Sequence, residues 1–262
     1  MTITLHHAGD IAVLTVDRPA AHNALNHDML QTLSQHLDAI AASDVRAVLV
    51  VGGGDRAFCA GADIGELRGR TDDEHLAGIA LGQGTFSRLA ALKVPTMAVI
   101  RGAALGGGLE LAMACSHRVA LPGARLGLPE IKLGLIPGYG GTQRLPRLVG
   151  ADKALDLILS GRLIPAEEAL AIGLVDHLAG DGDAVDIGLA LLDSLEAHAS
   201  LAGQLPAAAH FVREAVRRAA TLGLEAGLLA EAELFVQTAR TADACEGIAA
   251  FLEKRPARFV GR

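Results

Sequence analysis

An α/β fold with a helical C-terminal region is predicted by two patterns in this 262-residue sequence. Over the first two thirds, short apolar segments typical of buried strands alternate with segments whose apolar residues recur at helical spacing. From about Val185 onward the sequence is alanine-rich, helical in its periodicity and almost free of strand patterns, and Pro206 and Gly223–Gly227 are expected to separate its helices. We therefore expect a core over residues 1–200 that carries the active site, and a helical region over residues 201–262.

The elements of the expected core follow one another closely along the chain. The first two strands are joined by Ala8-Gly9-Asp10, a combination that favours a hairpin. The first helix is expected to begin at Asn26 or His27, because leucine and isoleucine then recur on one face. In chain order we expect strands at 2–7 and 11–16, a helix at 26–41, a strand at 45–51, a helix at 76–92, and strands at 96–100 and 117–121.

Composition limits the partners and the compartment that we expect. The net charge of −7 argues against nucleic acid or an anionic membrane as the main partner. No apolar run reaches the length of a membrane span, and residues 1–19 lack the pattern of a secretory leader. Cys59, Cys115 and Cys245 have neither disulfide nor zinc spacing, so we expect reduced core thiols in a cytoplasmic protein. A lysine that meets a phosphate must come from a short list: Lys93, Lys132, Lys153 and Lys254.

Common motifs for nucleotides, metals and nucleophiles are missing from the sequence. It contains no G-x-x-x-x-G-K-[ST], H-E-x-x-H, G-x-S-x-G or C-x-x-C, and its glycine-rich stretches do not match the dinucleotide fingerprint. Asp181, Asp183 and Asp186 resemble a calcium loop only in part, because no acid follows at the end of the loop. No metal site is expected.

An acidic residue interrupts the otherwise small and apolar segment Ala103–Cys115. Glu110 follows Gly106-Gly107-Gly108, which would leave backbone N–H groups accessible at the start of a helix. Such donors suit negative charge that develops on a substrate oxygen. The alternative is a structural acid in the first turn of the helix, where the helix dipole favours a carboxylate.

A second acid lies in apolar surroundings twenty residues later. Glu130 stands between proline and isoleucine and precedes the glycine-rich stretch 134–141. Its alternatives are an exposed turn glutamate or an ion pair with Lys132, Arg144 or Arg147.

The loop 56–63 is a third candidate, because its small side chains would let a ligand approach backbone N–H groups. Its alternative is a tight turn in which Asp63 caps a helix. Taken together, two acids in apolar segments and glycine-rich loops beside them indicate general acid–base chemistry next to an oxyanion hole. The residues alone do not identify the substrate.

At these positions the sequence resembles the enoyl-CoA hydratase/isomerase (crotonase) family. The resemblance covers nearly the whole chain, and the order of its motifs is highly specific. The motifs are Arg18-Pro19 with Asn23-Ala-Leu-Asn26, then AFCAGADI, GGGLELAMAC, LGLPEIKLGLIPGYGGTQRLPRLVG, the stretch Ile172-Gly-Leu-Val175 and TADACEGIAAFLEKR.

The resemblance implies a crotonase-like spiral of ββα units with a C-terminal helical region that assembles homotrimers, which commonly pair into hexamers. It implies an acyl-CoA thioester as substrate, so that CoA arrives with the substrate and no separate cofactor is needed. The activity it implies is enoyl-CoA hydration, the addition of water to a trans-2-enoyl-CoA in fatty-acid or related acyl-CoA catabolism.

The resemblance also implies roles for individual residues. The backbone N–H groups of Ala62 and Gly107 would form the oxyanion hole for the thioester oxygen. Glu110 would be the base that activates water, and Glu130 the acid that protonates the α-carbon. Gly138 would help to place the water through its N–H group.

Contacts with CoA are implied for two parts of the chain. Ala60, Asp63 and Ile64, next to the oxyanion hole, would lie along the CoA. Phe235 and Lys254 match C-terminal positions that in family members help to hold CoA, sometimes from a neighbouring subunit. Lys254 is also a plausible phosphate partner as one of few lysines.

Two residues depart from the family pattern, and several other functions remain as alternatives. Leu128 stands where several hydratases carry glutamine, and Tyr139 stands where small or aromatic residues alternate, which puts acyl-chain preference in doubt. The alternatives are a double-bond isomerase, a hydratase of an unusual acyl-CoA, or a relative that binds RNA or CoA with secondary catalysis. A serine hydrolase has little support, because Ser116 and His117 are expected to point to opposite faces of a strand.

Overall fold

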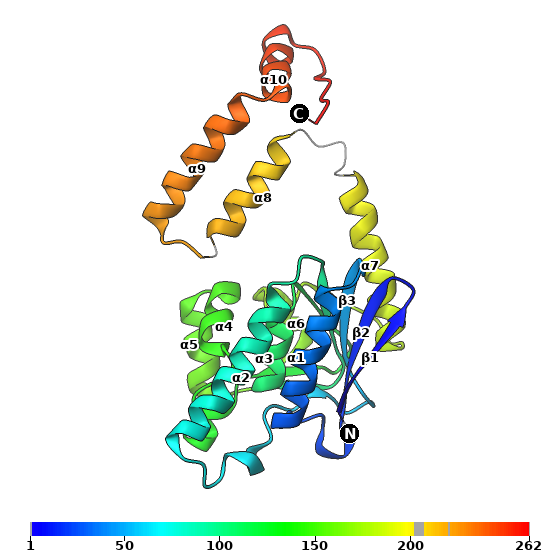
Figure 1. Ribbon diagram of the computed structural model, residues 1–262, viewed down its shortest axis with the longest axis vertical. Helices are drawn as coiled ribbons and strands as arrows, with labels where there is room; N and C mark the ends of the chain where they lie inside the picture. Colours follow the sequence, from blue (N-terminus) through cyan, green and yellow to red (C-terminus); the bar gives the residue numbers. More distant parts are fainter. Residues whose placement is uncertain (1, 202–206, 220, 262) are drawn as a thin grey trace. The chain divides into compact units, whose positions relative to one another are not determined.

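The computed structural model describes residues 2–201, 207–219 and 221–261 (Figure 1). The chain divides into two compact units, Met1–Leu192 and Asp193–Arg262. The division falls within helix α7 (Ala184–Leu201), slightly earlier in the chain than the expected boundary after residue 200. Each unit is described by itself below.

Strands and helices alternate through the first unit. The strands are β1 (Thr2–Ala8), β2 (Ile11–Asp17), β3 (Ala47–Gly52), β4 (Ala57–Cys59), β5 (Thr96–Ile100), β6 (Ala103–Leu105), β7 (His117–Ala120), β8 (Arg125–Gly127), β9 (Ile164–Pro165) and β10 (His177–Leu178). The α-helices are α1 (His27–Ala41), α2 (Asp72–Ala90), α3 (Gly107–Ala114), α4 (Gly141–Val149), α5 (Ala151–Ser160) and α6 (Ala166–Ala171), and the 3-10 helices are η1 (Pro19–Ala21), η2 (Ile64–Leu67) and η3 (Glu130–Leu133).

The strands form two sheets. The larger has the order β1-β2-β3-β5-β7-β10 and is parallel except for the β1–β2 hairpin. The smaller has the order β4-β6-β8-β9, with β4, β6 and β8 parallel. In the successive pairs β3–β4, β5–β6 and β7–β8, the first strand joins the larger sheet and the second joins the smaller. This repeat of two strands followed by a helix is the expected ββα arrangement.

The smaller sheet determines where the candidate site forms. The carboxyl ends of neighbouring parallel strands meet at the same edge of a sheet. The loops that leave β4, β6 and β8 therefore start side by side, although they are far apart in the sequence. These loops contain residues 60–63, 106–107 and 128–130, which are the three segments singled out above.

Helices α1, α2 and α3 lie side by side in Figure 1. Helix α1 begins as expected, because the Asn26 side chain accepts a hydrogen bond of 2.9 Å from Met29 N. Helix α2 begins earlier than the expected residue 76. A reciprocal capping box between Thr71 and Glu74 starts it, and its first turn is acidic.

Burial separates the three cysteines. Cys59 and Cys115 are free and buried, as expected of core thiols, and burial raises the pKa of each to about 12. Cys245 is also free but is exposed, so the expectation that it is a core thiol is wrong. It lies on a helix of the second unit that turns this side chain outward.

The second unit consists of helices: the end of α7, then α8 (Ala208–Ala219), α9 (Leu224–Ala239) and α10 (Ala242–Glu253). Gly223 is the N-cap of α9, but Gly227 lies inside α9 and ends no helix, contrary to expectation. Pro206 is outside the described residues. Asp243 is only 2% exposed and accepts backbone N–H groups from Ala207, Val260 and Gly261, which ties the C-terminal segment to α10.

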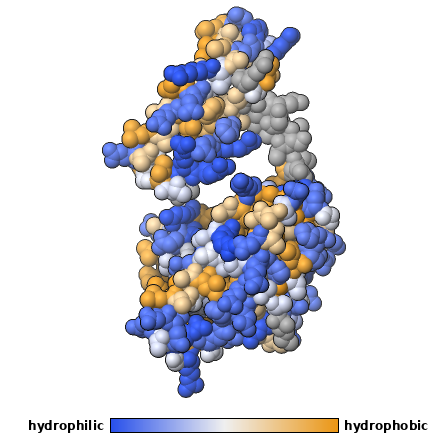
Figure 2. Space-filling view, viewed as in Figure 1, coloured by the Kyte–Doolittle hydropathy of each residue, from blue (hydrophilic) through white to orange (hydrophobic). Residues whose placement is uncertain are grey.

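Apolar residues are spread among hydrophilic ones on the visible surface (Figure 2). Across the described residues, no helix is both long enough and apolar enough to cross a membrane. In the same part of the chain, no group of three or more His, Cys, Asp or Glu side chains is placed to hold a metal ion.

Candidate active site

Glu110 lies in the first turn of α3 and is 1% exposed. Its Oε1 accepts two backbone hydrogen bonds, at 2.8 Å from Tyr139 N and 2.6 Å from Gly141 N. Burial, together with the charge of Glu130, raises the pKa of this carboxyl to about 7 against the opposing effects of the two N–H groups and Arg144. Glu110 is therefore a buried acid that can exchange a proton near neutral pH.

Glu130 starts η3 at the end of the β8 loop and is half-buried. Its Oε2 is buried without a hydrogen-bond partner in the described part of the chain, and burial raises the pKa of this carboxyl. The ion pairs considered from the sequence, with Lys132, Arg144 or Arg147, do not occur among the described residues. An unpartnered buried acid suits a group that holds a proton for a substrate.

Glycines make room for both carboxyl groups. A Cβ atom at Gly106 would lie 2.8 Å from Glu130 Oε1, and one at Gly141 would lie 2.9 Å from Glu110 Oε1. Gly106 also has φ +50°, a backbone conformation that favours glycine. The glycine-rich stretches therefore shape the surroundings of the two acids.

The N–H groups of Ala62 and Gly107 lie close together at the ends of the β4 and β6 loops. A Cβ atom at Gly107 would be 3.2 Å from Ala62 N. Gly61, with φ +118°, turns the chain just before Ala62. Backbone hydrogen bonds from Leu25 N to Gly61 O and from Asp63 N to Leu25 O hold the residues on either side of Ala62. Neither the Ala62 nor the Gly107 N–H group donates a hydrogen bond within the described residues, so both are available to a ligand.

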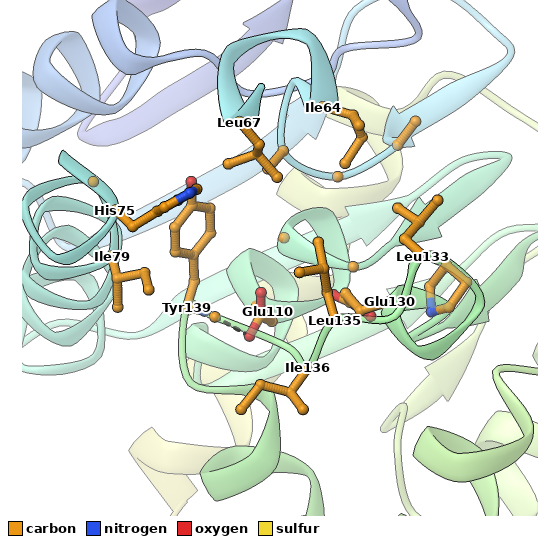
Figure 3. Close-up of a pocket in the computed structure, with 18 of the residues that line it drawn as sticks. Ile64, Leu67, His75, Ile79, Glu110, Glu130, Leu133, Leu135, Ile136 and Tyr139 are labelled. Atoms are coloured by element: carbon orange, nitrogen blue, oxygen red, sulfur yellow. Dashed lines mark hydrogen bonds between the residues drawn. The ribbon is translucent and has the colours of Figure 1, made fainter. Parts of the chain in front are cut away.

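A cavity of about 400 Å³ joins these groups (Figure 3). Glu110 and Glu130 both line it, as do Ala62 and Gly107. The remaining candidates Ala60, Ile64 and Gly138 line it as well. Two acids with raised pKa values thus share one cavity with a pair of free N–H donors.

The Asp63 side chain lies in a different environment from those of Ala62 and Ile64. Its side chain accepts a 2.6 Å ion-pair hydrogen bond from Arg18 Nη1 and caps η2 through Gly65 N at 3.1 Å. The Arg18 side chain holds the pKa of Asp63 below its ordinary value. The capping alternative named above describes this side chain, and Asp63 does not line the cavity.

Comparison with known proteins decides the family. The sequence model of the family described as enoyl-CoA hydratase/isomerase matches residues 6–262. The chain belongs to this family. It is 38% identical over 254 residues to the short-chain-enoyl-CoA hydratase of Clostridium acetobutylicum, with 97% of this chain and 95% of that protein covered. It is 41% identical over 254 residues to the 2,3-dehydroadipyl-CoA hydratase of Escherichia coli K12, with 96% of each covered.

Solved structures agree with the family. The crystal structure of an enoyl-CoA hydratase from Bacillus anthracis matches with a TM-score of 0.76 and 33% identity, covering 99% of each chain. The expected crotonase fold is thereby confirmed. Membership of the enoyl-CoA hydratase/isomerase family, inferred from motifs alone, is confirmed as well.

Two of the expected CoA contacts lie in the second unit of this family member. Phe235 is on α9 and is 73% exposed. Lys254 is the C-cap of α10 in a left-handed conformation with φ 55°. Their roles toward CoA stay predictions.

Sequence reasoning missed several residues of the cavity. The N–H groups of Tyr139 and Gly141 hold Glu110, but nothing in the sequence indicated that this loop returns to α3. Helix α2 and the loop before it contribute Arg70 and His75 to the wall. A signal was available in α2, where glycines at buried helical positions such as Gly78 mark close approach of another group.

The geometric argument against a serine hydrolase was wrong. Ser116 Oγ lies 3.0 Å from His117 Nδ1, because Ser116 precedes β7 and is not alternating within it. Ser116 Oγ also donates to Thr96 O at 2.8 Å and accepts from Thr96 N at 2.9 Å. The pair therefore joins β5 to β7, and it does not line the cavity.

Proposed function

We propose that the protein is an enoyl-CoA hydratase that adds water reversibly, in a syn sense, to the double bond of a trans-2-enoyl-CoA and yields a 3-hydroxyacyl-CoA. One observation carries this proposal. Glu110 and Glu130 share a cavity with the free N–H groups of Ala62 and Gly107, and burial raises the pKa of both acids. This is the arrangement needed to move a proton beside a polarised carbonyl.

The reaction begins with the thioester carbonyl oxygen between the N–H groups of Ala62 and Gly107. Hydrogen bonds from both donors draw electron density toward that oxygen, so the β-carbon becomes electrophilic. Negative charge then accumulates on the thioester oxygen as water adds. The first-turn position of Gly107 in α3 adds the positive end of the helix dipole.

The two acids divide the proton transfers. Two N–H groups stabilise the Glu110 carboxylate, which suits a base that removes a proton from water. Oε2 of Glu130 has no partner among the described residues, which suits an acid that keeps a proton and delivers it to the α-carbon. The charge of Glu130 raises the pKa of Glu110, so a proton on one carboxyl favours the ionised form of the other, and this division meets both needs. Gly138, at the cavity wall, is proposed to help place the water.

The finer features of the assembly belong to the same proposal. We place Ala60 and Ile64 along the CoA, with Phe235 and Lys254 contributing from the C-terminal unit. A homotrimer or a pair of trimers is proposed from the family resemblance, and no cofactor beyond the substrate's own CoA. The three free thiols, two of them buried, support a cytoplasmic enzyme.

The test is a spectrophotometric assay of hydration with crotonyl-CoA and longer 2-enoyl-CoAs. Glu110→Gln and Glu130→Gln are each expected to lower kcat by about 10²–10⁴-fold, because each removes a group that transfers a proton. Glu167→Gln, an exposed residue of α6, is the matched control and is expected to keep full activity.

A wild-type protein that hydrates none of these thioesters would refute the proposal, as would full activity in both active-site variants. Conversion of β,γ-enoyl-CoAs at a higher rate than hydration would instead assign a double-bond isomerase, since the same acids can carry a proton between carbons.

A further inference from the structure

One part of the cavity wall is polar although it takes no part in the proposed proton transfers. Arg70, His75 and Tyr139 line the cavity together with apolar side chains such as Leu67 and Ile79. Figure 3 shows His75 and Ile79 on the side of the cavity opposite Leu133, with Glu110 between the two sides. His75 and the Tyr139 ring therefore lie on the side of the cavity away from Leu133.

Arg70 has hydrogen-bonding capacity that the protein does not use. Its Nη2 meets Glu66 Oε2 at 3.3 Å, longer than the roughly 2.7–2.9 Å of a strong charge-assisted bond. Its Nη1 donates no hydrogen bond to the described residues, although the side chain is only 21% exposed. The side chain is partly exposed, so this free donor is available to an acceptor that a ligand brings into the cavity.

Helix α2 has glycines next to both Arg70 and Tyr139. A Cβ atom at Gly78 would lie 2.9 Å from Arg70 Nη1, and one at Gly82 would lie 2.5 Å from Tyr139 Cε1. Both glycines are buried inside the helix, where glycine is unfavourable relative to alanine. The rigid ring of Tyr139 needs the space at Gly82, whereas the flexible end of Arg70 could move away from a methyl group added at Gly78.

Tyr139 presents its hydroxyl group to the same region. Its ring packs edge-on against Phe86 with centroids 5.6 Å apart, which fixes its direction. The hydroxyl makes no hydrogen bond within the described residues. Burial and the charges of Glu110 and Glu66 raise the pKa of this hydroxyl, while the charge of Arg70 opposes them, so the guanidinium lies within electrostatic reach of it.

We propose that Arg70 and the Tyr139 hydroxyl bind a carboxylate at the far end of the acyl group, so that the preferred substrates are 2-enoyl-CoAs with a terminal carboxylate. This inference rests on the proposed hydratase function. A guanidinium binds a carboxylate through paired N–H donors, and a phenol adds a third donor. Leu67 and Ile79 offer apolar surface for the methylene groups between. A methyl-ended chain would instead bury the Arg70 donors without an acceptor.

The experiment compares two substrates of equal length: trans-hex-2-enoyl-CoA and its counterpart whose sixth carbon is a carboxylate. Crotonyl-CoA, which has a short methyl-ended chain and no terminal carboxylate, reports hydration itself. For the wild type, kcat/KM is expected to be at least about tenfold higher for the carboxylated substrate, the usual scale of a charge-assisted hydrogen bond.

Variants then assign the preference to individual groups. Arg70→Met is expected to lower the ratio of the two kcat/KM values by about 10–100-fold, mainly through KM of the carboxylated substrate, and Arg70→Lys is expected to restore part of it. Tyr139→Phe, which keeps the ring, is expected to lower the ratio a few-fold. Arg68→Met is the matched control, since Arg68 is exposed on the same segment and does not line the cavity.

The ratio also separates this inference from the proposed function. A wild type that hydrates crotonyl-CoA but has no higher kcat/KM for the carboxylated six-carbon substrate than for trans-hex-2-enoyl-CoA would overturn the carboxylate site alone. Equal losses on both six-carbon substrates in Arg70→Met would show a structural role and overturn it too. A wild type that hydrates neither crotonyl-CoA nor the six-carbon pair would overturn the hydratase and this site together.

Discussion

At the scale of single residues, Glu110 shows a conflict between stability and chemistry. The carboxyl is 1% exposed, and two backbone N–H groups partly compensate for the loss of water around its charge. The compensation is incomplete, because burial still raises the pKa of Glu110 to about 7. The ionised form that the proposed role of Glu110 as a base requires is thus the form that the folded protein disfavours.

Replacement of Glu110 by glutamine is expected to stabilise the protein in a pH-dependent way. A carboxyl with a folded-state pKa of about 7 and an ordinary value of 4.5 holds its proton more tightly in the folded state, so stability falls as pH rises from about 4.5 to 7. The loss above pH 7 is roughly 3 kcal/mol, at 1.36 kcal/mol for each pKa unit. Glutamine keeps the acceptor oxygen and carries no charge. Its advantage over the wild type should therefore be small at pH 5 and near its maximum at pH 8.

Urea unfolding of the wild type and Glu110→Gln at pH 5 and pH 8 measures this difference. Glu167→Gln, exposed and outside the cavity, should unfold like the wild type at both values. A stability difference for Glu110→Gln that stays the same at both pH values would contradict the argument.

At the scale of elements, α2 determines one wall of the cavity through its glycines. Gly82 is buried against the ring of Tyr139, whereas Gly84, two residues later, is exposed and has nothing within 4 Å of the Cβ position. Glycine therefore allows close packing at Gly82, whereas no neighbouring group requires it at Gly84.

Alanine substitutions at these two glycines should have opposite effects. Gly84→Ala should raise the free energy of unfolding by roughly 0.5–1 kcal/mol, because alanine favours the helix and meets no neighbour. Gly82→Ala should lower it by about 1–3 kcal/mol, since the added methyl group overlaps the Tyr139 ring. Thermal or urea unfolding of both variants checks the signs. Stabilisation by Gly82→Ala would show that the ring moves aside without cost.

Sequence patterns predicted helices whose start and buried face depend on residues close together in the chain. Helix α1 was predicted correctly because Asn26 caps it and its buried residues recur at helical spacing. The first turn of α2 was missed because its acidic residues have no apolar periodicity, and only the Thr71–Glu74 capping box marks its start.

The candidate site, too, was predictable only where nearby residues in the sequence determine it. Glycines before Glu110 indicated free N–H groups, and the structure places those of Ala62 and Gly107 together. The hydrogen bonds from Tyr139 and Gly141 to Glu110 were not predictable, because they depend on how a loop about thirty residues later folds back. The sequence shows which residues share a loop, but which loops lie side by side depends on the order of the strands in the sheet.

At the scale of the whole molecule, the C-terminal unit exposes large apolar side chains on successive helices. On α10, Phe251 is 83% exposed and Leu252 is 73% exposed, and Phe235 on α9 is 73% exposed. Large apolar side chains that a single chain leaves this exposed are typical of surfaces that bind another chain. The proposed trimer or pair of trimers would cover them with further copies of this protein.

The double substitution Phe251→Ser with Leu252→Ser is expected to break this assembly. It removes two large apolar side chains from the expected interface, while both positions are already exposed within the described chain, so the fold of each unit should persist. Light scattering after size-exclusion chromatography should give three or six times the protomer mass for the wild type and a smaller species for the variant. Glu231→Ser, exposed on α9, is the control and should leave the mass unchanged. A monomeric wild type would contradict the assembly, and an unchanged mass in the double variant would place the interface elsewhere on the chain.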